Sequence, residues 1–309
     1  MASPLILVTG ASGFVGPHVV AALNQAGHRL RLAQRRPHDA PDGIETIVTG
    51  DLAGPIDWRP ALEGVDHVVH MAGLAHAGPG LDEALYNRIN TEATLELAQA
   101  AVAAGVRRFV YLSSIKALSG AFDGPPLSEA AEPVPGDAYG RSKLAAERGL
   151  DRLALDWVAL RPTLIYGSGV KANMAALLRL ARLPIPLPFG DLKAPRSLLA
   201  VENMADAIRF TLTPDCPARQ AYTVSDPEPI SVADILAALR SGLGRSPGLL
   251  AVPEALLRRL ARLAGREETF LKLAGSLVAR PERLLKAGWQ PPAETKAALA
   301  RLAAGPRAG

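Results

Sequence analysis

The segment from Val8 to Gly16, which reads VTGASGFVG, restricts the possible folds of this chain more than any other segment. It directly follows an apolar run and precedes a stretch of helical periodicity, so it occupies the first strand-to-helix turn. Glycines with this spacing permit a tight turn, close approach of the backbone to a pyrophosphate, and close packing of the helix on the strand. The helix N-terminus then offers free N–H groups and its positive dipole end to phosphates. A glycine triplet alone is weak evidence, but in this context it predicts a dinucleotide site. The contacts expected at this turn are Gly10, Ser12, Gly13, Phe14, Val15 and Gly16.

Short apolar runs alternate with longer segments of helical periodicity through about residue 165. The strands predicted in this part are 4–9, 29–33, 44–49, 66–71, 107–113 and 157–161. Their residues are mostly apolar, as in strands that are covered on both faces. The helices predicted between them are 14–26, 82–104 and 137–154. This alternation predicts an α/β fold with a Rossmann-type, doubly wound parallel sheet.

The alternation of strands and helices ends at about residue 165. Further along, Pro184, Pro186 and Pro188 lie within five residues and predict a loop over 183–196. The later helices are predicted at 170–182, 202–213, 231–242, 253–264 and 281–287. A strand at 221–224 is expected to return to the sheet. We therefore predict a dinucleotide-binding domain over residues 1–165, with a return segment over about 196–226, and a smaller mixed α/β C-terminal substrate lobe over 166–309.

The composition is that of an ordinary globular protein, with 49% hydrophobic and 21% charged residues in 309. The net charge of +4 comes from scattered arginines, so no nucleic-acid partner is expected. No apolar run approaches the roughly 20 residues of a membrane span, and no leader is visible, so a cytoplasmic protein is expected. The helix at 253–264 is basic and amphipathic, and we interpret it as a domain helix rather than a membrane-surface element.

Cys216 is the only cysteine of the chain, so neither an intrachain disulfide nor a thiolate metal cluster is expected. Its segment, TPDCP, predicts a surface turn with an inert thiol. We expect no metal at the site.

The end of the second predicted strand reads Gln34-Arg35-Arg36. An NAD site usually has an acid here for the ribose 2′-hydroxyl, whereas an NADP site offers arginine to the 2′-phosphate. Arginine forms forked, charge-assisted bonds to phosphate. Arg35 and Arg36 therefore favour NADP(H), with NAD(H) still possible.

Tyr139 and Lys143 lie four residues apart near the start of a predicted helix, so they share one face, one turn apart. A phenol with a pKa of about 10 is a poor base at neutral pH. A nearby ammonium group and a cationic nicotinamide are expected to lower that pKa. The position of the pair after the fifth strand, in a chain with a dinucleotide turn, predicts a proton-transfer role for Tyr139.

Several segments resemble the extended short-chain dehydrogenase/reductase family, also described as the NAD-dependent epimerase/dehydratase family. The glycine turn resembles the TGxxGxxG of that family, and the resemblance covers nearly the whole chain. Gly50-Asp51-Leu52 resembles the segment that contacts adenine, and His70-Met-Ala-Gly73 resembles the segment beside the cofactor. The resemblance thus implies further cofactor contacts at Asp51, Leu52, Met71, Ala72 and Gly73.

Asn90, in the segment INTEA, matches the helix asparagine of the family's catalytic tetrad. Tyr139 and Lys143 match its Tyr-x-x-x-Lys pair, and Ser114 matches its strand-five serine. The resemblance implies that Lys143 also holds the nicotinamide ribose and that Ser114 polarises the substrate oxygen.

The catalytic serine is the point where this chain departs from the family pattern. Counting back from Gly120 puts Ile115, which cannot donate a hydrogen bond, at the serine position. We therefore interpret the segment as SSIK followed by a turn with one extra residue, with Ser114 as the catalytic serine. Ser113 is the alternative, and Ser119 is disfavoured.

The segment RPTLIYG at 161–167 resembles the crossing segment of nucleotide-sugar epimerases and dehydratases. The resemblance implies that Asn173 and Arg196 contact a nucleotide diphosphate, and Arg196 follows the proline-rich loop, where a ligand clamp is plausible. His76 follows the fourth strand and is a candidate for lining the sugar pocket, although a lone histidine is more often a polar surface residue. Lys116 and Lys171 are weaker candidates for the same anionic ligand.

Together these features predict an enzyme acting on a small-molecule nucleotide sugar, by 4-keto reduction of the sugar or, alternatively, as a UDP-hexose 4-epimerase. The arginines after strand two favour reduction. A dehydratase is disfavoured because Ile115-Lys116 follow Ser114, where that subclass usually carries Asp-Glu. A ketoreductase for an apolar carbonyl and a non-catalytic NADP-binding protein are the remaining alternatives. The family resemblance also implies a homodimer, formed by helices 82–104 and 137–154.

Overall fold

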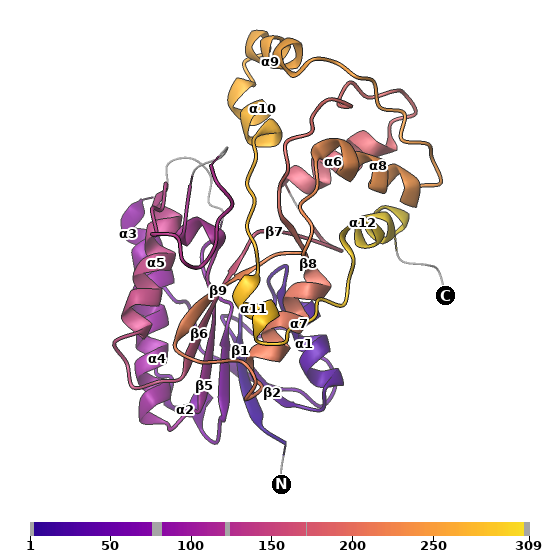
Figure 1. Ribbon diagram of the computed structural model, residues 1–309. Helices are drawn as coiled ribbons and strands as arrows, with labels where there is room; N and C mark the ends of the chain where they lie inside the picture. Colours follow the sequence, from indigo (N-terminus) through magenta and orange to yellow (C-terminus); the bar gives the residue numbers. More distant parts are fainter. Residues whose placement is uncertain (1–2, 76–81, 121–123, 171, 306–309) are drawn as a thin grey trace.

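Seven parallel strands form the central sheet of this computed structural model, which describes residues 3–75, 82–120, 124–170 and 172–305. The strand order is β3-β2-β1-β4-β5-β6-β9 (Figure 1). Their bounds are β1 Leu5–Thr9, β2 Arg29–Gln34, β3 Glu45–Val48, β4 His67–His70, β5 Arg108–Leu112, β6 Trp157–Pro162 and β9 Gln220–Val224. The order changes direction between β1 and β4, and in open sheets ligands bind beyond the carboxyl ends of the strands at such a point. The predicted Rossmann-type fold is confirmed.

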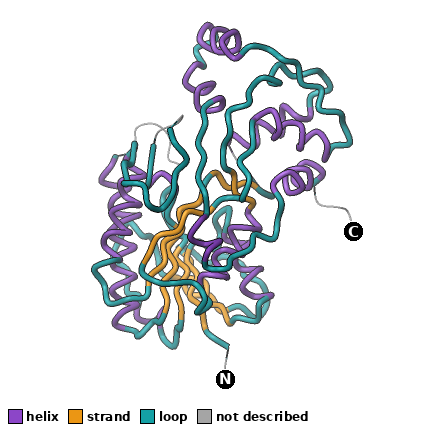
Figure 2. The backbone as a smooth tube through the Cα atoms, viewed as in Figure 1, coloured by secondary structure: helices purple, strands orange, loops and turns teal. Residues whose placement is uncertain are grey.

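Helices cover both faces of the sheet, with α4 and α5 on one side and α1 and α7 on the other (Figures 1 and 2). The helices on the two sides of the sheet, including short ones that pack on other helices, are α1 Gly16–Gln25, α2 Arg59–Leu62, α3 Glu83–Tyr86, η1 Asn87–Glu92, α4 Ala93–Ala103, η2 Ile115–Ala117, α5 Ala138–Leu150, α7 Val201–Thr211 and α11 Glu282–Lys286. Alternate residues of β1 reach opposite cores, Ile6 and Val8 on the α1 side and Leu5 and Leu7 on the α4 side. This two-sided burial explains why the strand is apolar throughout.

The C-terminal lobe has its own apolar core, formed by side chains such as Met174, Leu236 and Leu299. Its helices are α6 Ala172–Arg182, α8 Val232–Gly242, α9 Glu254–Leu263, α10 Glu267–Ala274 and α12 Thr295–Ala304. A short parallel pair, β7 Leu164–Tyr166 and β8 Leu198–Ala200, lies between this lobe and the sheet (Figure 1). Among the described residues, no helix has the length and apolar character needed to cross a membrane.

Several elements differ from the sequence prediction. The edge strand β3 is mostly exposed, so its apolar appearance did not mean cover on both faces. The predicted helix 82–104 contains a π-helical turn, η1, between its two α-helical parts. The short pair β7–β8 and the helices α2 and α10 were not predicted, because runs this short carry little periodicity. The ten-residue helix α12 was not predicted either.

Cys216 lies in a turn, as predicted, but the prediction that this turn is at the surface is wrong. Cys216 has 0% exposure and belongs to the core on the α1 side of the sheet. Its carbonyl oxygen accepts a hydrogen bond from Arg108, at 3.0 Å. Burial raises the pKa of the Cys216 thiol, which disfavours the reactive thiolate form.

Candidate active site

The glycine turn between β1 and α1 packs directly on the segment that follows β4. Gly10 has a φ of +76°, and a Cβ atom at this position would lie 2.6 Å from the amide nitrogen of Ala72. A Cβ atom at Gly16 would overlap the carbonyl oxygen of Ala11. The first turn of α1 contains no acidic residue, so negative charge does not oppose an anion there. The turn therefore fits the pyrophosphate of a dinucleotide.

The residues predicted to contact the adenosine half of the cofactor lie after β2 and β3. Arg35 is exposed and lies 3.5 Å from Asp51 as an ion pair, and Arg36 is also exposed. The Gln34 side chain folds back on its own loop, where it accepts from the backbone N–H of His38 and donates to its carbonyl oxygen. Both arginines thus lie exposed just beyond the carboxyl end of β2.

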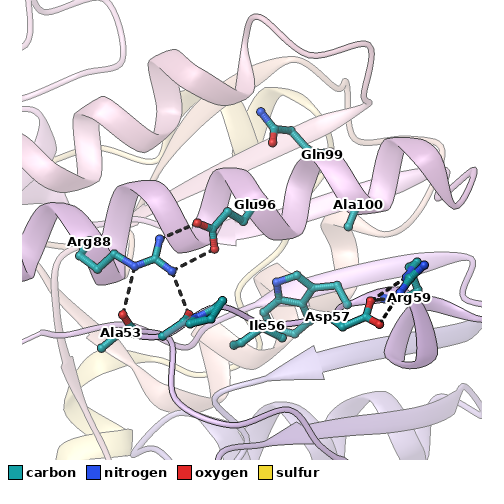
Figure 3. Close-up of a pocket in the computed structure, with 11 residues that line it drawn as sticks. Ala53, Ile56, Asp57, Arg59, Arg88, Glu96, Gln99 and Ala100 are labelled. Carbon is teal, nitrogen blue, oxygen red and sulfur yellow. Dashed lines mark hydrogen bonds and ion pairs between the residues drawn. The ribbon is translucent and has the colours of Figure 1, made fainter.

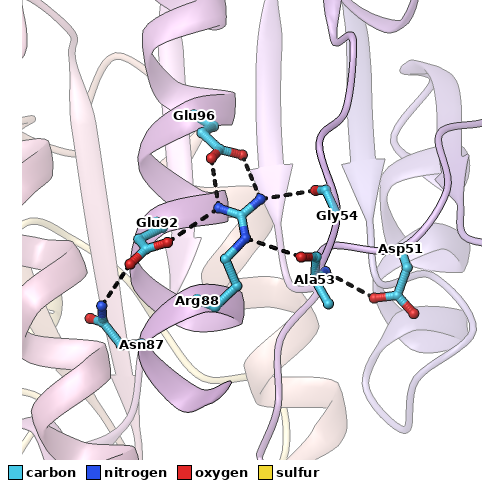
Figure 4. A network of polar contacts seen from close by, with 7 residues as sticks. All are labelled: Asp51, Ala53, Gly54, Asn87, Arg88, Glu92 and Glu96. Atoms are coloured by element: carbon cyan, nitrogen blue, oxygen red, sulfur yellow. Dashed lines mark hydrogen bonds and ion pairs between the residues drawn. The ribbon is translucent and has the colours of Figure 1, made fainter. Parts of the chain in front are cut away.

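Arg88 ties this adenosine-side loop to the helix that carries Asn90 (Figure 4). Its guanidinium donates to the carbonyl oxygens of Ala53, at 3.2 Å, and Gly54, at 2.9 Å. The same group pairs with both carboxylate oxygens of Glu96, at 2.6 and 3.1 Å. A forked, charge-assisted contact of this kind fixes geometry as well as contributing energy.

A cavity of about 530 Å³ lies beside this network, between residues 53–59 and the face of α4 that carries Glu96 and Gln99 (Figure 3). None of the predicted catalytic residues lines it. Its charged groups are already paired, since Arg59 contacts Asp57 and Arg88 contacts Glu96. The predicted catalytic residues therefore lie outside this cavity.

Tyr139 lies in the first turn of α5, beside Ser114 at the end of β5. The helix begins there because the Asp137 side chain accepts a hydrogen bond from the backbone N–H of Gly140, at 2.7 Å. Asp137 also pairs with Lys116, at 2.6 Å. A hydrogen bond joins the side chains of Ser114 and Tyr139. The structure thus brings these two predicted site residues together.

Ser113, the alternative catalytic serine, faces away from Tyr139. Its hydroxyl donates to Glu147, at 2.5 Å, and Glu147 forms a buried ion pair with Arg161, at 2.6 Å. Ile115 is buried against Leu118 and Ala279, so it does not occupy the serine position. The geometry therefore favours Ser114 over Ser113 as the serine of the site.

Lys143 is buried one turn after Tyr139, with its amino group 5.9 Å from the centre of the Tyr139 ring. The amino group donates to the carbonyl oxygen of Leu112, at 2.9 Å, and lies 4.7 Å from the centre of the Tyr111 ring. Burial lowers the pKa of Lys143 to about 7, and the charge of Glu147 partly offsets this.

The pKa of Tyr139 differs from the expectation. Desolvation of the phenol raises it to about 12, although the hydrogen bond from Ser114 acts in the opposite direction. Burial lowers the charge that Lys143 carries at neutral pH, and this weakens the stabilisation of a phenolate. The protein's own groups therefore keep Tyr139 protonated near neutral pH.

Asn90 is fully buried in the π-helical turn η1. Its amide oxygen accepts from the backbone N–H of Leu74, at 2.8 Å, and its amide nitrogen donates to the carbonyl oxygen of Leu74 and to Ser142. A Cβ atom at Gly73 would lie 2.8 Å from Oδ1 of Asn90 and 3.3 Å from Nζ of Lys143. The segment after β4 is thus enclosed by predicted catalytic residues, and π-helical turns are frequent at functional sites.

The sequence analysis did not identify four residues that shape this site. Tyr86 lies next to Tyr139, with ring centres 6.1 Å apart, and Tyr111 lies beneath Lys143. Glu147 and Arg161 hold Ser113 away from the site. Of these four residues, only Glu147 could have been identified from the sequence, because it follows Lys143 by one helical turn and so lies on the same helix face.

The predicted diphosphate contacts lie in the C-terminal lobe. Arg196 is half-buried, and its guanidinium donates to the carbonyl oxygens of Leu273 and, at 2.6 Å, Gly275, at the end of α10. Asn173 lies in α6, but its side chain is outside the described part of the structure. His76 and Lys171 also lie outside the described residues.

Comparison with known proteins agrees with the predicted family. The model of the NAD dependent epimerase/dehydratase family matches residues 6–224. A UDP-glucose 4-epimerase from Vibrio cholerae is 35% identical over 300 residues, which is 93% of this chain and 90% of that protein. A ceramide reductase from Caulobacter vibrioides is 33% identical over 68% of this chain and 62% of that protein. The structure of MoeE5 in complex with UDP-glucose and NAD has a TM-score of 0.73 and 27% identity, covering 96% of this chain and 97% of that one.

The buried Lys143 predicts a specific pH dependence of stability. Its pKa is about 7 in the native protein and 10.5 in a solvated lysine, so between these values the unfolded chain binds a proton that the native protein lacks. Stability therefore rises with pH over this interval, by at most about 1.4 kcal/mol per pH unit for one proton.

We expect the free energy of unfolding of the wild type, minus that of Lys143→Met, to rise between pH 7 and pH 10.5 in urea titrations. Lys286→Met is the matched control, because it removes a lysine that stays exposed on α11. A flat or falling difference for Lys143→Met would contradict the lowered pKa of this buried amine.

Proposed function

Because the chain belongs to the NAD-dependent epimerase/dehydratase family, we propose that it is a nucleotide-sugar oxidoreductase whose net reaction is 4-epimerisation of a UDP-hexose. One observation carries the proposal. Ser114 and Tyr139 are hydrogen-bonded at the carboxyl edge of the sheet, one turn from Lys143, in a chain that resembles a UDP-glucose 4-epimerase over 93% of its length.

The roles of the side chains follow from their positions. Tyr139 exchanges the proton of the sugar 4-hydroxyl, and Ser114 shares a hydrogen bond with the same oxygen. Lys143 contributes positive charge beside the phenol and holds the nicotinamide ribose. A bound nicotinamide cofactor supplies the hydride chemistry at the sugar carbon.

The substrate's diphosphate would bind in the C-terminal lobe, through Arg196 and Asn173. These contacts lie far from the reacting carbon, so their binding energy serves to position the sugar. In the structure the guanidinium of Arg196 donates to two carbonyl oxygens at the end of α10, so a diphosphate would either bind beside these contacts or replace them.

Net reduction of a UDP-linked 4-keto sugar is the second candidate. Two observations favour it over epimerisation. The phenol of Tyr139 is protonated near neutral pH, as a proton donor to a ketone must be. The loop after β2 presents Arg35 and Arg36 instead of an acid, which suits NADP(H), a cofactor that enters, donates hydride and leaves.

We also propose that the chain forms a homodimer through the helical segments 82–104 and 137–154. Leu95 on α4 packs against Gly149 on α5, so the two helices already form one continuous surface. Val102 is 36% exposed on the same helix as Leu95, which would suit burial against a second copy.

The reaction is tested with purified protein and UDP-hexose pairs in the presence of NAD+. We expect interconversion of two UDP-hexoses that differ at C4, with no net change in nicotinamide absorbance. Stoichiometric consumption of NADPH with a UDP-4-keto-6-deoxy sugar, without interconversion, would instead establish the reductase. Turnover of an apolar ketone alone would overturn both nucleotide-sugar candidates.

The serine assignment predicts unequal losses of turnover. Tyr139→Phe should lower kcat by about 10²–10⁴, the usual contribution of general acid–base catalysis, with cofactor affinity nearly intact. Ser114→Ala should lower kcat more than Ser113→Ala, because only Ser114 contacts Tyr139. Equal kcat values in the two serine variants, measured at saturating cofactor, would refute the assignment.

Cofactor preference is tested at Arg35. If Arg35 binds a 2′-phosphate, Arg35→Ala should weaken NADPH binding by about tenfold to a hundredfold, the loss of one charge-assisted contact. NADH affinity should change little and serves as the internal control. Titration of nicotinamide fluorescence measures both. A wild type that binds NADH more tightly than NADPH would refute the preference for NADP(H).

A further inference from the structure

His70, the last residue of β4, is fully buried between the cofactor turn and the helix that carries Asn90. Its Nδ1 atom lies 2.7 Å from the hydroxyl of Thr9, at the end of β1. Its Nε2 atom lies 3.0 Å from the hydroxyl of Thr94, at the start of α4. The imidazole thus connects the end of β1, in the sheet, to the start of α4, in the helical layer.

The hydrogen positions along this bridge follow from its two ends. The Thr94 hydroxyl donates to the carbonyl oxygen of Asn90, at 2.8 Å, and with its proton used there it accepts from Nε2 of His70. The Thr9 hydroxyl accepts from the backbone N–H of Ala72, at 3.2 Å, and among the described contacts Nδ1 of His70 is the one acceptor for its proton. Both ends require a neutral imidazole with its proton on Nε2.

The direction of donation is therefore the same along the whole chain of bonds. It begins at the Ala72 N–H and passes through Thr9, His70 and Thr94 to the Asn90 carbonyl. Burial lowers the pKa of His70 to about 3, and the charge of Lys143 adds to this effect. A neutral imidazole is thus consistent with the surroundings as well as with the bonds.

His70 is also connected to Lys143 through the ring of Tyr111. Its ring stacks on Tyr111, with centres 5.9 Å apart and planes at 17°. The amino group of Lys143 lies 4.7 Å from the centre of the same Tyr111 ring. The Tyr111 hydroxyl donates to the Asn90 carbonyl oxygen, which is also the end of the hydrogen-bond chain.

We propose that His70 is a positioning residue, which connects the cofactor turn at Thr9 and Ala72 to Asn90 and to the Tyr111 ring beneath Lys143 through one directed chain of hydrogen bonds. The proposal rests on the proposed oxidoreductase function. His70 contacts neither Tyr139 nor Ser114 among the described interactions, so it acts through the residues it holds. Removal of the chain should affect both cofactor binding and turnover.

The first experiment reads the proton directly. In protein labelled with ¹⁵N-histidine, the His70 resonances, assigned by their loss in His70→Phe, should show a protonated Nε2 and an unprotonated Nδ1 at pH 7. The opposite tautomer or an imidazolium would overturn the proposal. This result needs no substrate, so it is independent of the proposed function.

The second experiment is a double-mutant cycle of His70→Phe and Thr94→Val. Phenylalanine keeps the ring but removes both hydrogen bonds, and valine removes one hydroxyl. Each variant should lower kcat about tenfold with the sugar KM nearly unchanged, and the double variant should lose little more than the worse single one. Thr211→Val is the control, because Thr211 is an equally buried threonine that donates to a helix carbonyl away from the site.

The outcomes separate the explanations. Multiplied losses in the double variant would show that His70 and Thr94 act independently and would overturn the proposal. Lower melting temperatures with an unchanged kcat of the folded fraction would reduce His70 to a structural residue. If no sugar is turned over, the proposed function fails, and the affinity of each variant for NADPH is measured instead of kcat. In that measurement we expect His70→Phe to weaken NADPH binding about fivefold, roughly the effect of one buried hydrogen bond, and Thr211→Val to leave it unchanged.

Discussion

The contact between the turn at Gly10 and the backbone of Met71 and Ala72 determines how the ends of β1 and β4 approach each other. A side chain at Gly10 would lie within 3 Å of three backbone atoms, so only glycine permits this spacing. Its φ of +76° is a second reason for glycine. The segment that follows β4 then lies beside Asn90 and Lys143, so the glycine turn and two of the predicted catalytic residues meet at this segment.

The charges beneath the site illustrate how function and stability compete. Lys143 loses hydration on burial, and its amino group is compensated by the Leu112 carbonyl oxygen, by the rings of Tyr111 and Tyr139 and by the more distant charge of Glu147. Glu147 and Arg161 are buried as a pair that also satisfies Ser113, so their hydration is replaced by ordered contacts. Each charge of this pair thus has its partner, whereas the amine of Lys143 is retained at a cost in stability. A residue with such a cost is a good indicator of chemistry.

Local patterns in the sequence carried most of the fold and part of the site. The apolar runs placed the strands of the central sheet, and the four-residue spacing placed Tyr139 and Lys143 on one helix face. The same patterns misplaced Cys216, because a turn between prolines looks exposed unless the core that covers it is known. They also gave no sign of Tyr86 or Tyr111, whose roles come from neighbours distant in sequence.

By itself the sequence determined the Rossmann-type architecture, the glycine turn, and the Tyr-x-x-x-Lys pair, since these depend on spacing along one strand or helix. Only the tertiary structure decided which serine faces Tyr139, because Ser113 and Ser114 are neighbours that point in different directions at the end of β5. It also decided the protonation of Tyr139 and Lys143, because desolvation depends on everything packed around a group. The role of His70 belongs to the same class, since its two partners lie 61 and 24 positions away and meet only when the sheet and helix are assembled.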